Sequence, residues 1–401
     1  MARIATAIFL AFTPFIARSQ SEPSMLVADG IPSAPAGLRE RIAPYLESRA
    51  ASFQGWHPSR REMLILTRFA DSMQVHSVER PGGARRQWTF SPEPVASARY
   101  RPVTGDAVLM SQDSGGGEFF QLYLRDVATG RTTRLTDGKS RNTGATWSRA
   151  GKEVAWASTQ RNGKDTDIWV MDPDKPGSAR MAWERKGGGW QVMDWSPDGR
   201  SLLVLEYVSI NESWIHVLDV ASGAARLLTP REGKVSHADA RFSADGRRVF
   251  CTSDEGGEFR GLTVIDVGTG KREAWLRDLP WDVEALEASP DGKWLAVASN
   301  EDGVSVLRLV DARTGKEKRR ASIPKGVVTG MEWHASGREL GFTLSHARSP
   351  ADAHSWDART GAVTRWTESE AGGMDTGRFA EPETIRVRGF DGTNVSGFLY
   401  R

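Results

Sequence analysis

Short apolar runs recur along the chain, separated by stretches rich in Gly, Pro, Asp and Ser. The runs at 63–66, 202–205 and 294–297 each consist of four apolar residues. Runs of this length between turn residues predict buried β-strands, since helices usually need ten or more residues. The pattern therefore predicts an all-β protein.

A turn motif of the form aromatic-Ser-Pro-Asp-Gly recurs at a nearly constant spacing. Its anchor positions are Trp56, Tyr100, Trp147, Trp195, Phe242, Ala288 and Trp333. Successive anchors lie 44 to 48 residues apart. The motif suits a tight turn because Pro fixes φ, Asp can bond its own backbone, and Gly accepts positive φ.

A second turn, Asp-x-x-Thr-Gly, keeps the same period, as at 126–130, 266–270 and 357–361. With the apolar runs, the two turns outline about four strands in each repeat. Four antiparallel strands repeated in this way are typical of one blade of a β-propeller. The sequence therefore predicts an all-β, seven-bladed β-propeller over residues 54–370, with a short N-terminal helical segment.

The anchor aromatics allow two interpretations. Their rings could stack on a sugar or a peptide. Their fixed place in each repeat instead favours packing between neighbouring blades, where a large ring buries apolar area worth about 2 kcal/mol or more.

Both ends of the chain depart from the repeat. Residues 20–53 are expected to be a helical segment, with one stripe of Leu38, Ile42 and Leu46 and a second that ends at Phe53. At the other end, 383–390 and 394–401 alternate around an Asp-Gly turn and predict a hairpin. A hairpin is marginal alone, so 371–401 is expected to start a further domain.

Residues 1–19 have the features of a secretory signal peptide. Arg3 precedes an apolar run from 4 to 16, and Ala-Arg-Ser follows at 17–19. A membrane anchor is the alternative, although the run is shorter than the roughly 20 residues of a spanning helix. We expect a periplasmic or secreted protein with no membrane span after signal removal.

Charge and cysteine content narrow the function classes. Lys and Arg number 53 and Asp and Glu 51, so composition does not favour a nucleic-acid or anionic-membrane partner. Cys251 is the single cysteine, which rules out an intramolecular disulfide. The histidines show no metal-binding spacing, and we expect no metal and no cofactor.

The seven repeats, the export signal and the closing Phe-Asp-Gly-x-x-x-Ser-Gly-Phe-Leu-Tyr at 390–400 resemble the prolyl oligopeptidase family of serine peptidases. The segments 56–65, 135–142 and 365–370 are most similar to bacterial dipeptidyl-aminopeptidase and acylaminoacyl-peptidase members. The resemblance covers essentially the whole chain after the signal peptide.

The resemblance implies a propeller that admits short or unfolded peptides to an α/β-hydrolase domain. In the family that domain begins at the final hairpin and carries the Ser, Asp and His triad, with Ser in Gly-x-Ser-x-Gly. This pentapeptide does not occur in the chain. We therefore expect that this chain carries no catalytic residue and hydrolyses nothing by itself. Its expected partners are the missing hydrolase domain and short peptides.

Two acidic glycine-rich loops, at 113–120 and 254–259, are candidate substrate contacts. Some dipeptidyl peptidase relatives hold the free amino terminus of the substrate with propeller carboxylates. Glu118 and Glu258 are therefore the candidate substrate-binding residues. The alternative is that both loops are flexible hairpin tips placed identically in their blades.

A different function class is also open. The chain resembles, less closely, the propeller protein of the periplasmic Tol-Pal system, which acts by protein contact. That protein has six blades and an N-terminal α/β domain, whereas seven repeats and a short helical segment are expected here.

Overall fold

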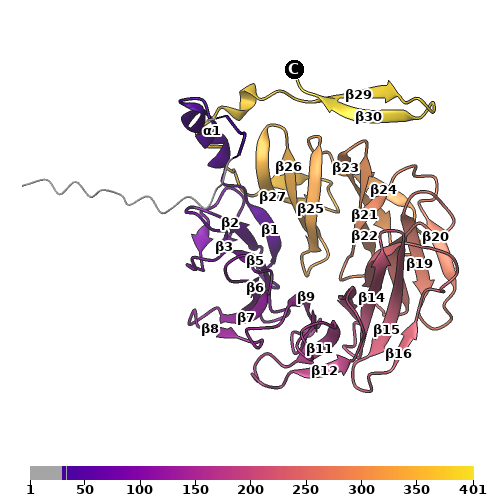
Figure 1. Cartoon of the computed structure of the whole chain (residues 1–401). Coiled ribbons are helices and arrows are strands. Elements are labelled where there is room, and N and C mark those ends of the chain that lie inside the picture. Colours follow the sequence, from indigo (N-terminus) through magenta and orange to yellow (C-terminus); the bar gives the residue numbers. More distant parts are fainter. Residues whose placement is uncertain (1–28, 33) are drawn as a thin grey trace, which may run out of the picture. The chain divides into compact units, whose positions relative to one another are not determined.

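The computed structural model describes residues 29–32 and 34–401, so the expected signal peptide lies outside the described residues. Within them, seven four-stranded antiparallel sheets are each built from four consecutive strands. Figure 1 shows these sheets arranged around a common centre. The seven-bladed propeller predicted from the repeat is confirmed.

The strand bounds follow the repeat from blade to blade. Blades 1 to 3 comprise β1 (Ser52–Trp56), β2 (Met63–Thr67), β3 (Gln74–Val78) and β4 (Arg86–Gln87); β5 (Val95–Tyr100), β6 (Ala107–Gln112), β7 (Gln121–Asp126) and β8 (Thr132–Arg134); and β9 (Asn142–Trp147), β10 (Val154–Ser158), β11 (Asp167–Met171) and β12 (Arg180–Trp183). Blades 4 and 5 comprise β13 (Trp190–Trp195), β14 (Ser201–Ser209), β15 (Glu212–Asp219) and β16 (Ala225–Leu227), then β17 (His237–Phe242), β18 (Arg248–Ser253), β19 (Gly261–Asp266) and β20 (Arg272–Trp275). Blades 6 and 7 comprise β21 (Val283–Ala288), β22 (Trp294–Glu301), β23 (Val304–Asp311) and β24 (Glu317–Arg320), then β25 (Gly326–Trp333), β26 (Glu339–His346), β27 (Ser349–Asp357) and β28 (Val363–Arg365).

The two repeated turns form for the reasons their residues suggest. In the first, the Ser196 hydroxyl donates to Asp198 Oδ1 at 2.6 Å, and Gly199 adopts a φ of 70°. In the second, Asp126 Oδ1 accepts from both the backbone N–H and the hydroxyl of Thr129, each at 2.7 Å. Asp closes each hairpin through local hydrogen bonds, so these strand boundaries depend on residues that are neighbours in the sequence.

The ring has two faces that carry different connections. Because neighbouring strands are antiparallel, the Ser-Pro-Asp-Gly turns leave each sheet from one end and the connections between its second and third strands leave from the other. The same order in every blade brings like connections to one side. We call the side of the second-to-third connections the loop face and the other the turn face.

The core lies between neighbouring blades, and the anchor aromatics are part of it. Trp195 is fully buried, and its indole N–H donates to the carbonyl of Thr146 on the preceding blade at 3.1 Å. Trp333 makes the equivalent bond to the Glu287 carbonyl at 3.0 Å. The prediction of packing between blades is confirmed for these positions.

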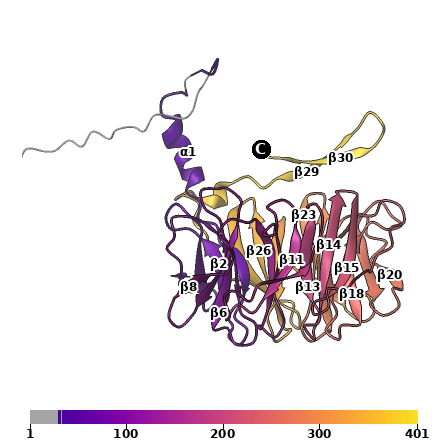
Figure 2. The ribbon, with the colours of Figure 1, turned by 60° about the horizontal axis from the view of Figure 1, so that its bottom comes forward.

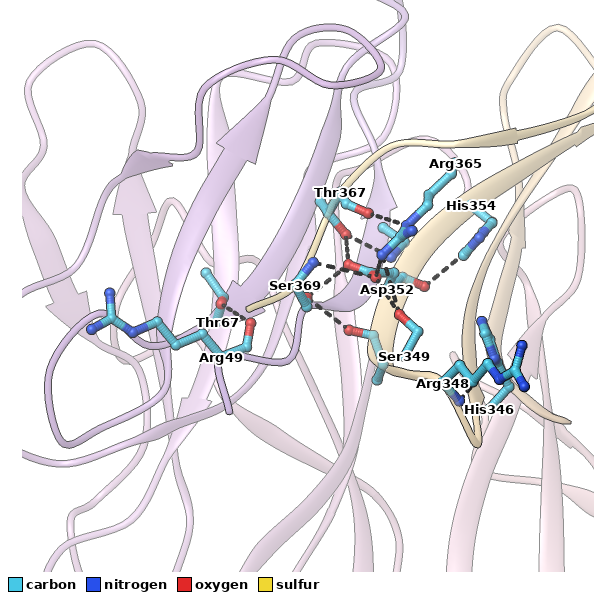
Figure 3. A network of polar contacts seen from close by, with 12 residues as sticks. Arg49, Thr67, His346, Arg348, Ser349, Asp352, His354, Arg365, Thr367 and Ser369 are labelled. Atoms are coloured by element: carbon cyan, nitrogen blue, oxygen red, sulfur yellow. Dashed lines mark hydrogen bonds and ion pairs between the residues drawn. The ribbon is translucent and has the colours of Figure 1, made fainter. Parts of the chain in front are cut away.

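The ring closes between blade 7 and blade 1 without sharing a strand between the two sheets that the structure describes. The Ala51 N–H donates to the Ala351 carbonyl at 2.7 Å, and the Arg49 N–H donates to the Glu370 carbonyl at 2.9 Å. A buried carboxylate, Asp352, gathers hydroxyl and guanidinium donors beside this junction (Figure 3). Side-chain polar contacts thus contribute to closure.

The N-terminal segment is less helical than its pattern suggests. Helix α1 spans Leu38–Leu46 and contains Pro44. The second helical stripe does not continue to Phe53, which lies in β1, pairs with Ile65 and is 2% exposed. Burial against β-sheet neighbours outweighs the local helical pattern there. No helix in the described part of the chain is long and apolar enough to cross a membrane.

The C-terminal segment follows the ring without joining it. A short 3-10 helix at Thr376–Arg378 precedes β29 (Glu383–Arg388) and β30 (Asn394–Leu399), which pair as a separate two-stranded sheet. The predicted hairpin is present, with Gly392 at a φ of 86° in its turn. Every residue of β29 is exposed, so this sheet has no packed face of its own.

Candidate functional site

Both candidate glutamates lie on the loop face. Glu118 is in the connection between β6 and β7 of blade 2, and Glu258 is in the connection between β18 and β19 of blade 5. The two loops therefore occupy the same place in their blades, as the sequence indicated. Three steps around the ring separate their blades, so the structure does not bring the two glutamates into one cluster.

The surroundings of the two glutamates differ. The Glu118 side chain is 73% exposed and pairs with Arg141 at 3.5 Å. Its backbone N–H donates to Asp113 Oδ2 at 3.0 Å, which holds the loop in shape. Glu258 lines a small cavity of about 130 Å³ together with Phe259. Both carboxylates are thus accessible from the loop face.

Large apolar side chains are also exposed on the loop face. Phe69 is 48% exposed, Phe119 54%, Ile210 77% and Phe259 41%. Each lies in a connection between the second and third strands of its blade. Blades 1, 2, 4 and 5 thus each present an exposed apolar side chain on the loop face.

The C-terminal hairpin lies on this same face (Figure 2). Arg386 of β29 pairs with Asp302, in the connection between β22 and β23, at 2.5 Å. The bond to Arg386 is the main reason that the pKa of Asp302 is lowered. The guanidinium of Arg348, in the next blade, donates to the Phe379 carbonyl at 3.0 Å. These contacts hold the C-terminal segment against the loop face.

A second feature lies on the ring axis at the turn face. A cavity of about 440 Å³ is lined by residues from all seven of the described blades, which places it around the axis. Charged side chains that immediately precede the anchor positions face it, namely Asp194, Arg241, Glu287 and Glu332. The first strand of each blade lines the axis, and alternation along that strand aims these side chains inward.

Ion pairs connect blades at this end of the axial cavity. Arg99 of blade 2 contacts Glu332 of blade 7 at 3.3 Å, passing over blade 1. Arg241 and Glu287 link blades 5 and 6 at 2.7 Å. Glu332 also accepts the Trp56 N–H of blade 1 at 3.1 Å. These carboxylates therefore connect the blades around the axial cavity.

Burial raises the pKa of three of these carboxylates. Desolvation raises the pKa of Glu332 and of Asp194, in each case offset in part by nearby arginines. Desolvation likewise raises the pKa of Glu287 to about 7, against the opposing effect of Arg241. These groups are held in a low-dielectric setting, where burial disfavours the charged form.

The raised pKa of Glu287 makes stability pH-dependent. The folded protein holds this proton up to about pH 7, whereas the ordinary value is 4.5. The stabilisation is thus complete below about pH 4.5 and is lost as the pH rises through about 7. Between about pH 5 and 8, the thermal midpoint of the wild type is expected to fall relative to that of Glu287→Gln.

Thermal melts at matched ionic strength measure this difference. The control is Glu284→Gln, which replaces an exposed glutamate of the same strand. Parallel midpoint curves for the wild type and Glu287→Gln across this range would contradict the assignment.

The sequence analysis missed the axial charges. Their signal was available, because each directly precedes an anchor residue and so recurs with the same period. Only the ring closure shows that Arg99 and Glu332, 233 positions apart, are partners. No group of three or more His, Cys, Asp or Glu in residues 29–32 and 34–401 could hold a metal ion.

Comparisons with known proteins agree with this architecture. The family model of the prolyl oligopeptidase N-terminal β-propeller domain matches residues 98–369. Dipeptidyl aminopeptidase BIII of Pseudoxanthomonas mexicana is 27% identical over 285 residues, which cover 66% of this chain and 38% of that protein. An uncharacterized peptidase of Bacillus subtilis, YuxL, is 26% identical over 183 residues, 45% of this chain and 25% of its own.

Solved structures share the fold. One of two prolyl endopeptidases analysed for inter-domain dynamics superimposes with a TM-score of 0.72 at 17% identity, covering 90% of this chain and 56% of its own. A puromycin-hydrolyzing peptidase of Mycobacterium tuberculosis gives a TM-score of 0.71 at 16% identity, covering 92% and 60%.

The chain thus spans less than two thirds of each of these relatives. The family match extends over more than half of the sequence and over most of the ring. This chain belongs to the prolyl oligopeptidase family, and its ring is the N-terminal β-propeller domain of that family.

Proposed function

We propose that this chain is the substrate-screening propeller of an exported serine peptidase of its family. The observation that carries the proposal is the asymmetry of the ring. The loop face presents exposed apolar side chains and the C-terminal hairpin, whereas ion pairs between blades surround the axial cavity at the turn face. The loop face is therefore suited to a partner domain, while the charged groups at the turn face are engaged within the ring.

The C-terminal hairpin indicates where a partner domain would lie. Val387, Val395 and Phe398 are exposed by 59%, 59% and 41%, and the outer edges of β29 and β30 are unpaired among the described strands. Exposed edges and apolar strand faces are normally covered by further sheet or by helices. An α/β-hydrolase domain that continues this sheet over the loop face would cover both.

In such an assembly the propeller does no bond chemistry. The hydrolase would supply a Ser nucleophile, a His base and an oxyanion hole, acting through an acyl-enzyme. The propeller would cover that site and exclude folded proteins by size. Short or extended peptides would still reach the chamber between the two domains.

Screening by size can be tested with a chimera. The chain is joined after Arg401 to the C-terminal remainder of the Pseudoxanthomonas dipeptidyl aminopeptidase. We expect the chimera to cleave chromogenic dipeptide substrates but to cleave a folded protein carrying the same sequence in a loop about 100-fold more slowly. The same hydrolase domain without a propeller is expected to discriminate far less.

Equal discrimination with and without the propeller would refute the screening role. If the chimera is inactive, the purified chain is mixed with the separately produced hydrolase domain, and complex formation is measured by sedimentation. Failure to associate would count against the proposal as well.

We propose that Glu118 or Glu258 holds the free amino terminus of peptide substrates. In the chimera, Glu118→Gln or Glu258→Gln is expected to raise KM for dipeptide substrates about tenfold, because one charge-assisted hydrogen bond is lost. An N-acylated substrate, which lacks the ammonium group, serves as the control and should be unaffected. An unchanged KM in both variants would reject the assignment.

Export is the remaining part of the proposal and rests on residues 1–19. Cell fractionation and N-terminal sequencing of the mature protein test it, and an intact N-terminus would overturn it. The non-enzymatic alternative, a Tol-Pal-like binding propeller, is not favoured, since the family match is to a peptidase propeller and the described ring has seven blades.

A further inference from the structure

A cavity of about 670 Å³ opens on the loop face between blades 3 and 4. Its walls are β9, the connection between β10 and β11, and the segment 188–192 that leads into β13. Phe119, next to the candidate Glu118, covers one side of its rim. The volume is within the range of small-ligand sites, roughly 300 to 1,000 Å³.

Glycines keep this cavity open. Gly144 has a φ of 64° and sits at a register shift that bends β9. Gly189 has a φ of 85°, and a Cβ there would meet the Tyr207 carbonyl oxygen at 2.3 Å. Gly188 differs, since its backbone is not left-handed and a Cβ would meet no atom within 4 Å. A side chain at Gly188 would therefore occupy the cavity without straining the fold.

The charges that line the cavity are positive. Arg141 and Lys164 contribute to its walls, and no carboxylate does. Among residues 29–32 and 34–401, Arg141 forms its one ion pair with Glu118, at 3.5 Å, and both side chains are more than half exposed. Exposed pairs of this kind contribute little, so the guanidinium can exchange its partner.

Lys164 makes no ion pair with any residue that the structure describes. Its neighbour Arg161 is different, because Asp165, Asp167 and Glu184 all contact its guanidinium. Of the side chains that line the cavity, Arg141 and Lys164 are the charged ones. Neither is fixed by an interaction within the propeller core.

The remaining lining suits a peptide. Thr143, Thr166 and Gln191 offer hydrogen-bonding groups, and Phe119 and Trp190 offer apolar area. An arginine binds a carboxylate through two parallel hydrogen bonds, and a lysine adds a point charge. Together these groups fit a short peptide segment that carries a carboxylate.

We propose that this cavity is a subsite for a peptide carboxylate, with Arg141 and Lys164 as its ligands. The inference deepens the proposed function, because it names a substrate feature that the propeller would select. The carboxylate can be the C-terminus of the peptide or an Asp or Glu side chain. The site belongs to the chain itself, so its binding can be measured without a hydrolase domain.

Isothermal titration of the purified chain tests the proposal. The probes are four N-acetylated hexapeptides of identical apolar content, with a free or amidated C-terminus and with Glu or Gln at the penultimate position. We expect binding by peptides with at least one carboxylate and none by the amidated Gln peptide. The two single-carboxylate peptides show which source the site accepts.

Variants assign the binding to this cavity. Arg141→Gln and Lys164→Gln are each expected to weaken binding about tenfold, the effect of one hydrogen bond to a charged group. Gly188→Leu, which adds a side chain at the wall of the cavity, should also weaken binding. Arg131→Gln, an exposed arginine in the turn between β7 and β8, is the matched control and should bind as the wild type does.

Three results would overturn the subsite. They are binding of the amidated Gln peptide as tight as that of the others, unchanged affinity in Gly188→Leu, and no binding of any peptide at millimolar concentration. A chimera that fails to discriminate by size would leave these titrations unaffected, so the two proposals fail separately.

Discussion

Asp352→Ala is expected to lower the free energy of unfolding by about 3 kcal/mol. The Asp352 side chain is 1% exposed. It accepts hydrogen bonds from the Thr367 hydroxyl at 2.6 Å, the Ser369 hydroxyl at 2.7 Å and the Arg365 guanidinium at 2.6 Å (Figure 3). Alanine would remove this shared buried acceptor, which costs several kcal/mol, although Ser369 and Arg365 keep the Ala351 and Thr367 carbonyls as acceptors. The partial exposure of Arg365 keeps the effect toward the lower end.

Asp352 lies where blade 7 meets blade 1, so its loss is expected to weaken the contact between these two blades. Arg85 of blade 1 approaches Asp352 at 3.9 Å and donates to the Ser369 hydroxyl at 3.2 Å. The network therefore connects blade 7 to blade 1, where no strand is shared between their sheets in the described ring. Faster amide exchange in β1 and β27 of the variant, relative to β14 and β15 of blade 4, is expected.

Urea denaturation followed by circular dichroism measures the stability change. Asp266→Ala is the control, since Asp266 accepts two local hydrogen bonds from Thr269 in an exposed turn. It should cost far less than Asp352→Ala, because the two hydrogen bonds lie in an exposed turn. If both variants lost the same small amount, Asp352 would have no special part in closing the ring.

Trp195→Ala is expected to cost about 4 kcal/mol, the range found for removing a buried aromatic side chain. Trp195 is fully buried in a cluster that joins Ile168 and Val170 of blade 3 to Leu202 and Leu218 of blade 4. Its removal would leave a cavity between two blades that the surrounding strands cannot fill, because each is fixed in its own sheet.

Trp195→Phe separates packing from hydrogen bonding. Phenylalanine keeps much of the ring volume but loses the indole N–H bond to the Thr146 carbonyl. We expect a loss of about 1 to 2 kcal/mol for this variant, well short of that for alanine. Guanidinium denaturation compares the two. An alanine variant as stable as the phenylalanine variant would contradict the packing role of the anchor aromatics.

The axial carboxylates and the loop-face groups differ in how many partners they have within the ring. The axial carboxylates are tied to neighbouring blades, as when Asp194 accepts the Phe242 N–H at 2.8 Å. The loop-face groups, such as Arg141, Lys164 and Phe119, have few partners in the ring. Residues with few internal partners are free to serve a ligand or another domain, which is why the proposals concern the loop face.

The sequence by itself determined the number of blades, the turns and the final hairpin. These features depend on local geometry: Asp126 bonds Thr129 three residues away, and Gly199 takes positive φ wherever its turn is placed. The repeat can be recognised in the sequence because each copy of a turn is formed by residues that are neighbours in the chain. The position of Glu118 at a loop tip was predictable for the same reason.

Tertiary structure alone decided which distant residues meet. The helical stripe toward Phe53 gave way to β1, because burial against Ile65 and the Gly341 backbone of blade 7 outweighs a local pattern. The pairing of Arg99 with Glu332 and the cavity beside Gly188 depend on how the blades close into a ring. The residues that meet at these two places lie on different blades. Alternation along a single strand does not specify which residues of another blade they face.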